Sequence, residues 1–190
     1  SSYTKNSDLL QEIDYVLKNL SSAVNQTVYF SVLSGGEVLY LLEERVPTPI
    51  TIQAKRGYKY PAYATGIGKA LLSGKTEKDI KTMYSEGLYK LTEHTIDDFD
   101  TLFSQMEETR KSGYSFEKEE SNRDVQCIAV PVKYKENVIA GMSVAVPVFY
   151  YSEEFEKKAM EELKKAKQHI EKLIQDNAQE WIYSPLETEV

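Results

Sequence analysis

The chain contains one cysteine, Cys127, within a stretch rich in β-branched residues, Asp124 to Pro147, that predicts two adjacent strands of a buried hairpin. A thiol that acts as a nucleophile needs a base beside it. The two histidines do not supply one, since His94 lies in an expected loop and His169 on the outer half of an expected helix. One cysteine and two scattered histidines also lack the spacing of metal ligands. We therefore predict that the chain has no catalytic residue, metal or cofactor.

The pairing within this hairpin decides which residues share a face with the thiol. If Tyr134 pairs with Val138 across a three-residue loop, one face carries small residues and the other carries bulky ones. A loop one residue shorter would shift the register and mix the two faces. The small face would consist of Cys127, Ala129, Gly141, Ser143 and Ala145, and the bulky face of Ile128, Val130, Val132, Met142, Val144 and Val146.

A sheet face made of small side chains has two uses. It lets a helix backbone come close, or it leaves a hollow in which a small molecule can sit. The expected helix from Gly66 to Leu72 contains two glycines, Gly66 and Gly68, each costing about 1 kcal/mol relative to alanine. Such glycines indicate that something approaches the backbone closely. From the sequence both uses of the small face stay open.

Length and charge exclude several classes of protein. The chain has 190 residues, which suits one domain with an appended helix, and its polar start suggests a domain cut from a longer chain. A net charge of -7 argues against a nucleic-acid surface, because phosphate binding needs clustered Lys and Arg. No apolar run approaches the roughly 20 residues of a membrane span. A single cysteine fits a reducing compartment, so we expect a cytoplasmic protein without membrane contact.

Apolar periodicity, helix caps and turn residues predict the other elements. In the first half we expect a helix from Asp8 to Val24 with Ser7 as its N-cap, a hairpin of Thr27 to Leu33 and Glu37 to Leu42 joined by Ser34-Gly35-Gly36, a loop from Glu43 to Tyr60, a helix from Gly66 to Leu72 capped by Thr65, and a helix from Glu77 to about Ser85 capped by Thr76. In the second half we expect a helix capped by Thr95 and stopped by Gly113, a strand from Tyr114 to Lys118, the central hairpin, a long helix from Ser152 or Glu153 through Ile174, and an irregular tail from Trp181.

This order of elements predicts an α+β fold in which helices flank an antiparallel sheet and a long helix comes near the C-terminus. Three segments follow from it. Residues 1–24 form a linker or transmitter helix, residues 25–178 form the main domain, and residues 179–190 form a tail.

Several ordered motifs resemble the effector-binding domain of the IclR family of bacterial transcription regulators. They are, in chain order, Tyr60 to Leu72 (YPAYATGIGKALL), Leu91-Thr92 with Thr95, Gly113-Tyr114 with its acidic neighbours, Cys127 to Val132 (CIAVPV) and Ala140 to Val144 (AGMSV). The resemblance covers nearly the whole chain. It implies a GAF-like fold, ligand binding rather than catalysis, a homo-oligomer that is a dimer or a tetramer, and contact with operator DNA only through a winged helix-turn-helix preceding Ser1.

The resemblance also implies the residues that bind a small-molecule effector. They are Gly66, Ile67, Glu117, Cys127 and Ser143. Where many relatives have a second serine and a glycine, this chain has Ala145 and Val146, and Glu117 stands where a shorter Asp is common. These departures favour a less polar or larger effector. Three tyrosines near the expected pocket entrance are candidates to stack on it, namely Tyr58, Tyr60 and Tyr63.

Each site residue also has an ordinary structural reading. Cys127 is equally consistent with a small buried apolar residue, and Ser143 with a donor to a neighbouring backbone group. The acidic residues Glu117, Glu119 and Glu120 also fit a solvated loop. Two other functions are therefore kept as alternatives: a cysteine-dependent enzyme on a GAF-like scaffold, and a structural dimerisation module with a filled pocket.

Overall fold

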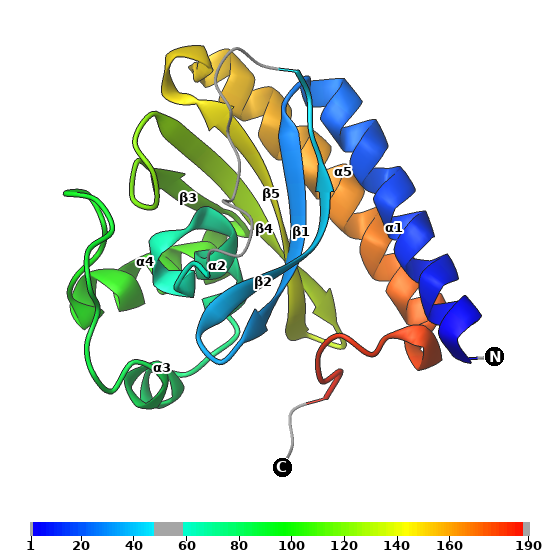
Figure 1. Cartoon of the computed structure of the whole chain (residues 1–190), viewed down its shortest axis with the longest axis horizontal. Helices are drawn as coiled ribbons and strands as arrows, with labels where there is room; N and C mark the ends of the chain where they lie inside the picture. The colour runs from blue at the N-terminus through cyan, green and yellow to red at the C-terminus, as the bar shows by residue number, and fades with distance from the viewer. Residues whose placement is uncertain (1, 48–58, 188–190) are drawn as a thin grey trace.

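A five-stranded antiparallel sheet, ordered β2-β1-β5-β4-β3, forms the middle layer of the molecule (Figure 1). The computed structural model describes residues 2–47 and 59–187, with side chains from residue 8 onward. The predicted α+β architecture is confirmed. The strands are β1 (Thr27–Ser34), β2 (Glu37–Glu44), β3 (Ser115–Lys118), β4 (Val125–Tyr134) and β5 (Asn137–Pro147).

Helices cover both faces of this sheet (Figure 1). The long helices α1 (Ser2–Val24) and α5 (Glu153–Asp176) lie side by side on one face. On the other face α2 (Gly66–Leu72) packs on β4 and β5, and α4 (Phe99–Ser112) packs against α2 and β3. The remaining helical segments are α3 (Glu77–Met83) and the single turns η1 (Ala62–Ala64), η2 (Val148–Tyr150) and η3 (Ala178–Glu180).

The register of the central hairpin agrees with the prediction, but its turn does not. Cys127 pairs with Ala145 as expected. Tyr134, however, pairs with Asn137 rather than with Val138, so the loop has two residues. Both loop residues, Lys135 and Glu136, have positive φ (46° and 69°), as a tight two-residue hairpin turn requires.

An irregularity beside the turn keeps the two faces apart. The register shifts by one residue between Val132 and Lys133, where β5 carries one residue more than β4. This β-bulge absorbs the residue that the short loop leaves over. Beyond it, Val132 pairs with Ala140 and the alternation proceeds in the predicted register. The prediction of the faces therefore holds although the prediction of the loop was wrong.

The two faces carry different cores. The face toward α1 and α5, called the α1–α5 face below, holds the bulky residues, and none of the six predicted ones is more than 1% exposed. The face toward α2, called the α2 face below, holds the small ones. The α1–α5 core includes Leu9, Ile13, Leu17, Phe30, Ile128, Val130, Met142, Val144, Leu163 and Ile170. The α2 core includes Tyr29, Tyr63, Ala64, Ile67, Ala70, Leu102, Met106, Ala129 and Ala145.

Most predicted helix ends are confirmed. Thr65 caps α2, since its Oγ1 accepts a hydrogen bond from the Gly68 amide at 2.8 Å. Thr76 caps α3 in a reciprocal capping box, and Ser152 caps α5. Gly113 ends α4 with φ of +85°, a conformation that glycine adopts without strain.

Two predicted caps were wrong. Ser7 lies inside α1, which begins at Ser2. The N-cap of α4 is Asp98 rather than Thr95, because the Asp98 carboxylate accepts from the Thr101 amide at 2.8 Å. The Thr95 hydroxyl instead accepts from the amides of Leu91 and Thr92 within the preceding loop.

The chain ends are tied to the α1–α5 core. Helix α1 packs along α5 and shares its core. The described part of the tail, through residue 187, is irregular as predicted and packs against the same core. Trp181 is 5% exposed, and its ring lies edge-on to Phe30 with ring centroids 6.1 Å apart. The division of the chain at residues 24 and 178 stays a prediction. The expected loop from Glu43 to Tyr60 falls largely outside the described residues, and β2 extends through Glu44.

Candidate functional site

Three of the five predicted site residues meet where α2 begins. The pairing of β3 with β4 places Glu117 directly opposite Cys127. The backbone of Gly66 lies above both, since a Cβ on Gly66 would be 3.1 Å from the Cys127 Cβ and 3.4 Å from the Glu117 Cβ. Ser115 fixes this approach by donating a hydrogen bond to the Gly66 carbonyl at 2.6 Å. Here the small face serves the first of its two uses, because a helix backbone comes close to it.

The other two predicted residues lie farther along the same face. Ser143 on β5 pairs with Ala129 on one side and Tyr29 on the other, and it is 2% exposed. Ile67 is buried over Gly141, where a Cβ would be 3.1 Å from the Ile67 Cγ1. The role of all five residues as effector ligands stays a prediction.

Glu117 is a buried carboxyl group with one oxygen unpaired. The residue is 1% exposed, and its Oε1 accepts a hydrogen bond from the Ser121 hydroxyl at 2.5 Å. Its Oε2 is buried without a partner among the described residues. Burial raises the pKa of Glu117 to about 7 and the Glu120 carboxylate raises it as well, whereas the Ser121 hydroxyl, Lys69 and the backbone amide of Glu120 act in the opposite direction. Leaving a buried polar group without a partner costs about 1–3 kcal/mol of folding free energy. A ligand that donates a hydrogen bond to this oxygen would recover that free energy on binding.

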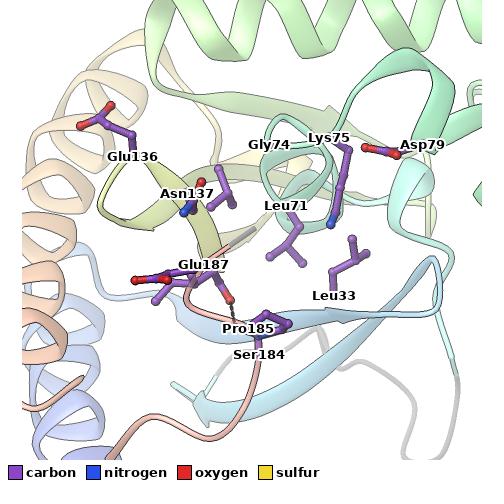
Figure 2. Close-up of a pocket in the computed structure, with 12 residues that line it drawn as sticks. Leu33, Leu71, Gly74, Lys75, Asp79, Glu136, Asn137, Ser184, Pro185 and Glu187 are labelled. Atoms are coloured by element: carbon purple, nitrogen blue, oxygen red, sulfur yellow. Dashed lines mark hydrogen bonds between the residues drawn. The ribbon is translucent and has the colours of Figure 1, made fainter. Parts of the chain in front are cut away.

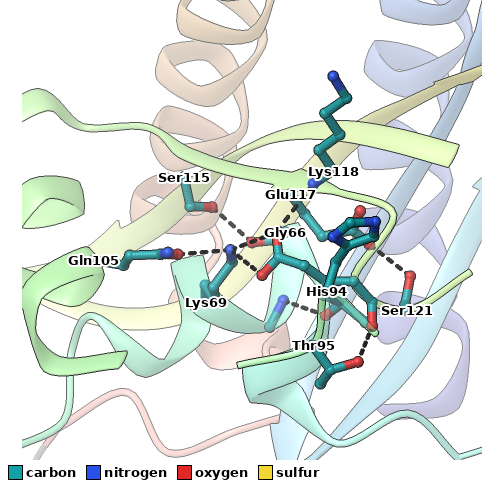
Figure 3. A network of polar contacts seen from close by, with 12 residues as sticks. Gly66, Lys69, His94, Thr95, Gln105, Ser115, Glu117, Lys118 and Ser121 are labelled. Atoms are coloured by element: carbon teal, nitrogen blue, oxygen red, sulfur yellow. Dashed lines mark hydrogen bonds and ion pairs between the residues drawn. The ribbon is translucent and has the colours of Figure 1, made fainter. Parts of the chain in front are cut away.

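Sequence reasoning missed Lys69, which forms a buried ion pair beside this site (Figure 3). The residue is 1% exposed, and its Nζ donates to the Gln105 Oε1 at 2.8 Å and to the two Glu120 carboxylate oxygens at 3.0 and 3.3 Å. A lysine is buried this deeply only when it is paired. The signal in the sequence was a single charge in the otherwise apolar helix GIGKALL. The solvated-loop reading is wrong for Glu117 and also for Glu120, which is 9% exposed.

The ion pair anchors the loop of residues 119–124, which joins β3 to β4. Two threonines hold its backbone, as Thr92 Oγ1 donates to the Glu119 carbonyl at 2.5 Å and Thr95 Oγ1 to the Glu120 carbonyl. The Lys118 amide donates to the Glu120 Oε2 at 3.0 Å. The two threonines quoted for the family resemblance therefore position this loop.

The same loop supplies two polar side chains to the α2 face. Ser121 reaches Glu117, and the Asn122 Nδ2 donates to the Tyr60 hydroxyl at 3.1 Å. Both side chains depend on the position of the loop backbone. The Lys69–Glu120 pair, which anchors that loop, therefore helps to position Ser121 and Asn122.

The side chain of Tyr40 on β2 extends this polar region. Burial raises the pKa of Tyr40, and its neighbours Cys127, Tyr29, Tyr60 and Glu117 raise it further. The Tyr40 ring lies edge-on to Tyr29 with ring centroids 5.2 Å apart. The phenol of Tyr40 is thus close enough to the thiol and to the carboxyl group of Glu117 to interact with both electrostatically. Nothing in its sequence neighbourhood, EVLYLLEE, distinguished it from an ordinary strand residue.

The proposed stacking role of Tyr63 is corrected by the structure. Tyr63 is fully buried, its hydroxyl donates to the Tyr89 carbonyl at 3.0 Å, and its ring packs edge-on against Tyr84. It is a core residue of the α2 side. Tyr60 is 3% exposed and lies at the cluster, whereas Tyr58 lies outside the described residues.

The surroundings of Cys127 do not activate its thiol. Burial raises the pKa of the thiol well above its ordinary value, Glu117 raises it as well, and the nearby ammonium of Lys69 lowers it less than burial raises it. Neither histidine is among the groups that act on it. Such a thiol stays protonated near neutral pH and is a weak nucleophile. Over the described ranges, the structure contains no group of three or more His, Cys, Asp or Glu that could hold a metal ion.

A separate hollow of about 480 Å³ lies at the opposite end of the sheet (Figure 2). The end of α2, the β4–β5 turn and the C-terminal tail line it, with Leu71, Lys75, Asn137 and Pro185 among its residues. None of the five predicted site residues lines this hollow. It is therefore distinct from the cluster around Glu117.

Comparisons with known proteins identify relatives of this chain. The family model described as bacterial transcriptional regulator IclR C-terminal matches residues 1–172. The HTH-type transcriptional regulator KdgR of Dickeya chrysanthemi is 30% identical over 152 residues, which are 79% of this chain and 50% of that protein. This chain spans about half the length of the curated relatives it matches. None of the helices in the described residues is long and apolar enough to cross a membrane.

Solved structures share the fold. The C-terminal domain of Escherichia coli KdgR is 27% identical with a TM-score of 0.77, and the match covers 88% of this chain and 99% of that one. The inducer-binding domain of PobR from Acinetobacter, a double mutant in complex with 3-hydroxybenzoic acid, also has a TM-score of 0.77 at 24% identity, covering 85% of this chain and 96% of that one. These likenesses confirm the expected GAF-like arrangement with its long C-terminal helix.

Proposed function

This chain belongs to the IclR C-terminal family of bacterial transcriptional regulators and represents its effector-binding domain, and from this premise we propose how it works. It binds a small-molecule effector on the α2 face at Gly66, Ile67, Glu117, Cys127 and Ser143. Binding alters the affinity for operator DNA of a helix-turn-helix module outside this chain. The protein acts in the cytoplasm, where that DNA lies.

One observation carries the proposal. Glu117 is buried at the start of α2 beside Cys127, and one of its carboxyl oxygens has no partner in the described part of the chain. A structural carboxyl group at this depth would ordinarily have both oxygens paired. The Glu117 carboxyl group, paired across the strands with Cys127, and the phenol of Tyr40 lie near one another, as a few convergent polar groups do in a ligand site.

The effector acts by favouring one arrangement of a homo-oligomer, either a dimer or a tetramer. A ligand shifts such an equilibrium only by its difference in affinity for the two arrangements. Helix α1 is the natural transmitter, because it packs along α5 and on the sheet strands β1 and β2. A shift of the sheet would therefore reach the N-terminal end of the chain through α1.

Of the two alternatives, the cysteine-dependent enzyme is excluded by the family, and the structural dimerisation module is left for experiment. The family consists of transcription regulators, which confirms that the chain is not an enzyme, and the raised pKa of the Cys127 thiol agrees with this. A purely structural dimerisation module differs from a sensor in one measurable way. Only a sensor gains stability from a ligand, because binding to the folded state stabilises it by mass action.

The experiment is a thermal-shift screen of this domain against sugars, sugar acids, small carboxylates and aromatic compounds. We expect a concentration-dependent rise in melting temperature with one chemical class. Cys127→Ser and Ser143→Ala should each reduce that rise, whereas Glu161→Gln on the exposed surface of α5 should leave it unchanged. An identical rise in the wild type and the three variants would show that the effector does not bind on the α2 face. Absence of any rise would favour the structural module.

Light scattering of the same samples tests the assembly. We expect a dimer or tetramer whose shape or stoichiometry changes when the stabilising compound is added. A monomer at all concentrations, with and without that compound, would contradict the oligomeric mechanism.

A further inference from the structure

The unpaired oxygen of Glu117 specifies what a ligand must bring to it. Oε1 already accepts from the Ser121 hydroxyl, so Oε2, which has no partner in the part of the chain that the structure describes, is the atom that remains for one. The residue is 1% exposed, and the Gly66 backbone and Cys127 lie against its Cβ side. An ionised carboxylate is an acceptor only, and it is satisfied by a group that donates a hydrogen bond.

Among the described residues, no nearby charged side chain is free to donate to Oε2. Lys69 is the ammonium that acts on Glu117, and it is committed to Glu120 and Gln105 at 2.8 to 3.3 Å. The other ionisable groups facing Glu117 are Glu120 on the 119–124 loop, Cys127 on β4 and Tyr40 on β2. Apart from the paired Lys69, all of them are neutral or negative, so the surroundings do not favour a second anion at Oε2.

We infer that the effector meets Oε2 of Glu117 with a hydrogen-bond donor, such as a hydroxyl group, and not with an ionised carboxylate. This inference rests on the proposed function and narrows its ligand to compounds that carry such a donor, of which sugars, polyols, hydroxy acids and phenols are the hydroxylated members. A compound whose polar groups are all ionised carboxylates has no hydrogen to donate. It could meet Oε2 only if Glu117 took up a proton first.

The two cases differ in the sign of their pH dependence. A hydroxyl donor binds the ionised carboxylate, so its affinity should rise as pH increases through about 7 and then level off. A carboxylate-only ligand needs the protonated form, so its affinity should fall over the same range. The slope therefore reports which atom carries the hydrogen.

Calorimetric titration of the domain with matched pairs of compounds tests the inference. The pairs are gluconate with adipate and 3-hydroxybenzoate with benzene-1,3-dicarboxylate, together with neutral sugars and polyols, each at about pH 6 and about pH 8. We expect the hydroxylated members to bind more tightly and to gain affinity with pH. Glu117→Gln should weaken their binding about 10-fold to 100-fold and remove the pH slope. Glu117→Leu, which removes the acceptor, should weaken it further, and Glu161→Gln should have no effect.

The outcomes separate this inference from the proposed function. A carboxylate-only compound that binds as tightly and loses affinity with rising pH would overturn the hydroxyl assignment and leave the sensor function standing. So would a hydroxylated ligand whose affinity is unchanged in both Glu117 variants, each folded by circular dichroism. If no compound binds the wild-type domain, the inference and the proposed function fail together.

Discussion

The two faces of the central hairpin come from the same two strands, yet they are built on opposite principles. On the α1–α5 face, bulky apolar side chains from β4 and β5 are buried under two long helices. On the α2 face, small residues lie beneath a seven-residue helix, next to a buried ion pair and a carboxyl group with one oxygen that no described residue contacts through a hydrogen bond. Burying such polar groups costs free energy, and dry packing elsewhere offsets it.

The difference shows how one sheet divides stability from recognition. A face filled with branched apolar residues has no room for a ligand, because protein cores are packed as densely as crystals. A face with small residues brings the helix backbone close and keeps polar groups near each other. We therefore expect mutations on the two faces to differ in kind, and four predictions examine this difference.

The largest effect is expected from breaking the buried ion pair. Lys69→Met leaves the Glu120 carboxylate buried without its ammonium, which should lower the free energy of unfolding by about 3 to 5 kcal/mol. Adding Glu120→Gln should restore part of the loss, since the charge is then removed while the amide of Lys118 keeps an acceptor. Urea unfolding of the single and double variants measures both. A single-variant loss below about 1 kcal/mol would show that the pair is not structural.

A cavity on the opposite face should cost nearly as much but leave the site untouched. Leu163→Ala removes a fully buried side chain of α5 and should lower the free energy of unfolding by about 2 to 5 kcal/mol. The neighbouring exposed Lys164→Ala is the matched control and should change it by less than about 0.5 kcal/mol. The carboxyl carbon signal of Glu117, followed by nuclear magnetic resonance as pH varies, should be the same in all three proteins. A displaced titration in Leu163→Ala would show that the faces are coupled.

The unpaired carboxyl group should make the α2 face sensitive to pH. In the unfolded chain Glu117 titrates near 4.5, and burial raises its pKa to about 7 in the folded protein. Between these values the folded state binds more protons, so its contribution to the free energy of unfolding falls as pH rises. Glu117→Gln abolishes this fall and should stabilise the protein at about pH 8 by up to about 3 kcal/mol, with little difference near pH 4. Urea unfolding across this range checks the sign; a variant less stable than wild type at about pH 8 would contradict it.

The smallest effect compares the helix caps on the two faces. Thr65→Ala and Ser152→Ala each remove a side-chain acceptor from the N-terminus of α2 or α5 and should cost about 1 kcal/mol. Helix α5 has 24 residues and should lose protection only in its first turn. Helix α2 has seven, so amide hydrogen exchange should accelerate along its whole length in Thr65→Ala. Equal, local effects in both variants would show that the site helix is as firmly held as the long one.

The sequence predicted the elements and the separation of the faces because these depend on short-range patterns. A two-residue alternation places Cys127 and Ala129 on one face whatever lies above them. The Gly35-Gly36 turn, the caps at Thr65 and Thr76 and the stop at Gly113 each involve residues within a few positions of one another. The family motifs add their order along the chain.

The errors occurred where a local pattern allowed two solutions. A two-residue turn with a bulge and a three-residue turn without one give the same register beyond Val132, so alternation could not distinguish them. Thr95 and Asp98 are both good caps, and the structure uses Asp98 for α4. Thr95 instead holds the 119–124 loop, through a hydrogen bond that spans 25 residues.

By itself, then, the sequence determined an α+β domain with one bulky and one small sheet face, and the place along the chain where Gly66, Glu117 and Cys127 stand. Only the tertiary structure decided that α2 rests on the small face at Cys127, that Lys69 reaches Glu120 across 51 positions, and that Oε2 of Glu117 is left without a partner among the described residues. The physical reason is range. Caps and alternation act between near neighbours, whereas burial, and with it the pKa of Glu117, depends on every element that closes over the residue.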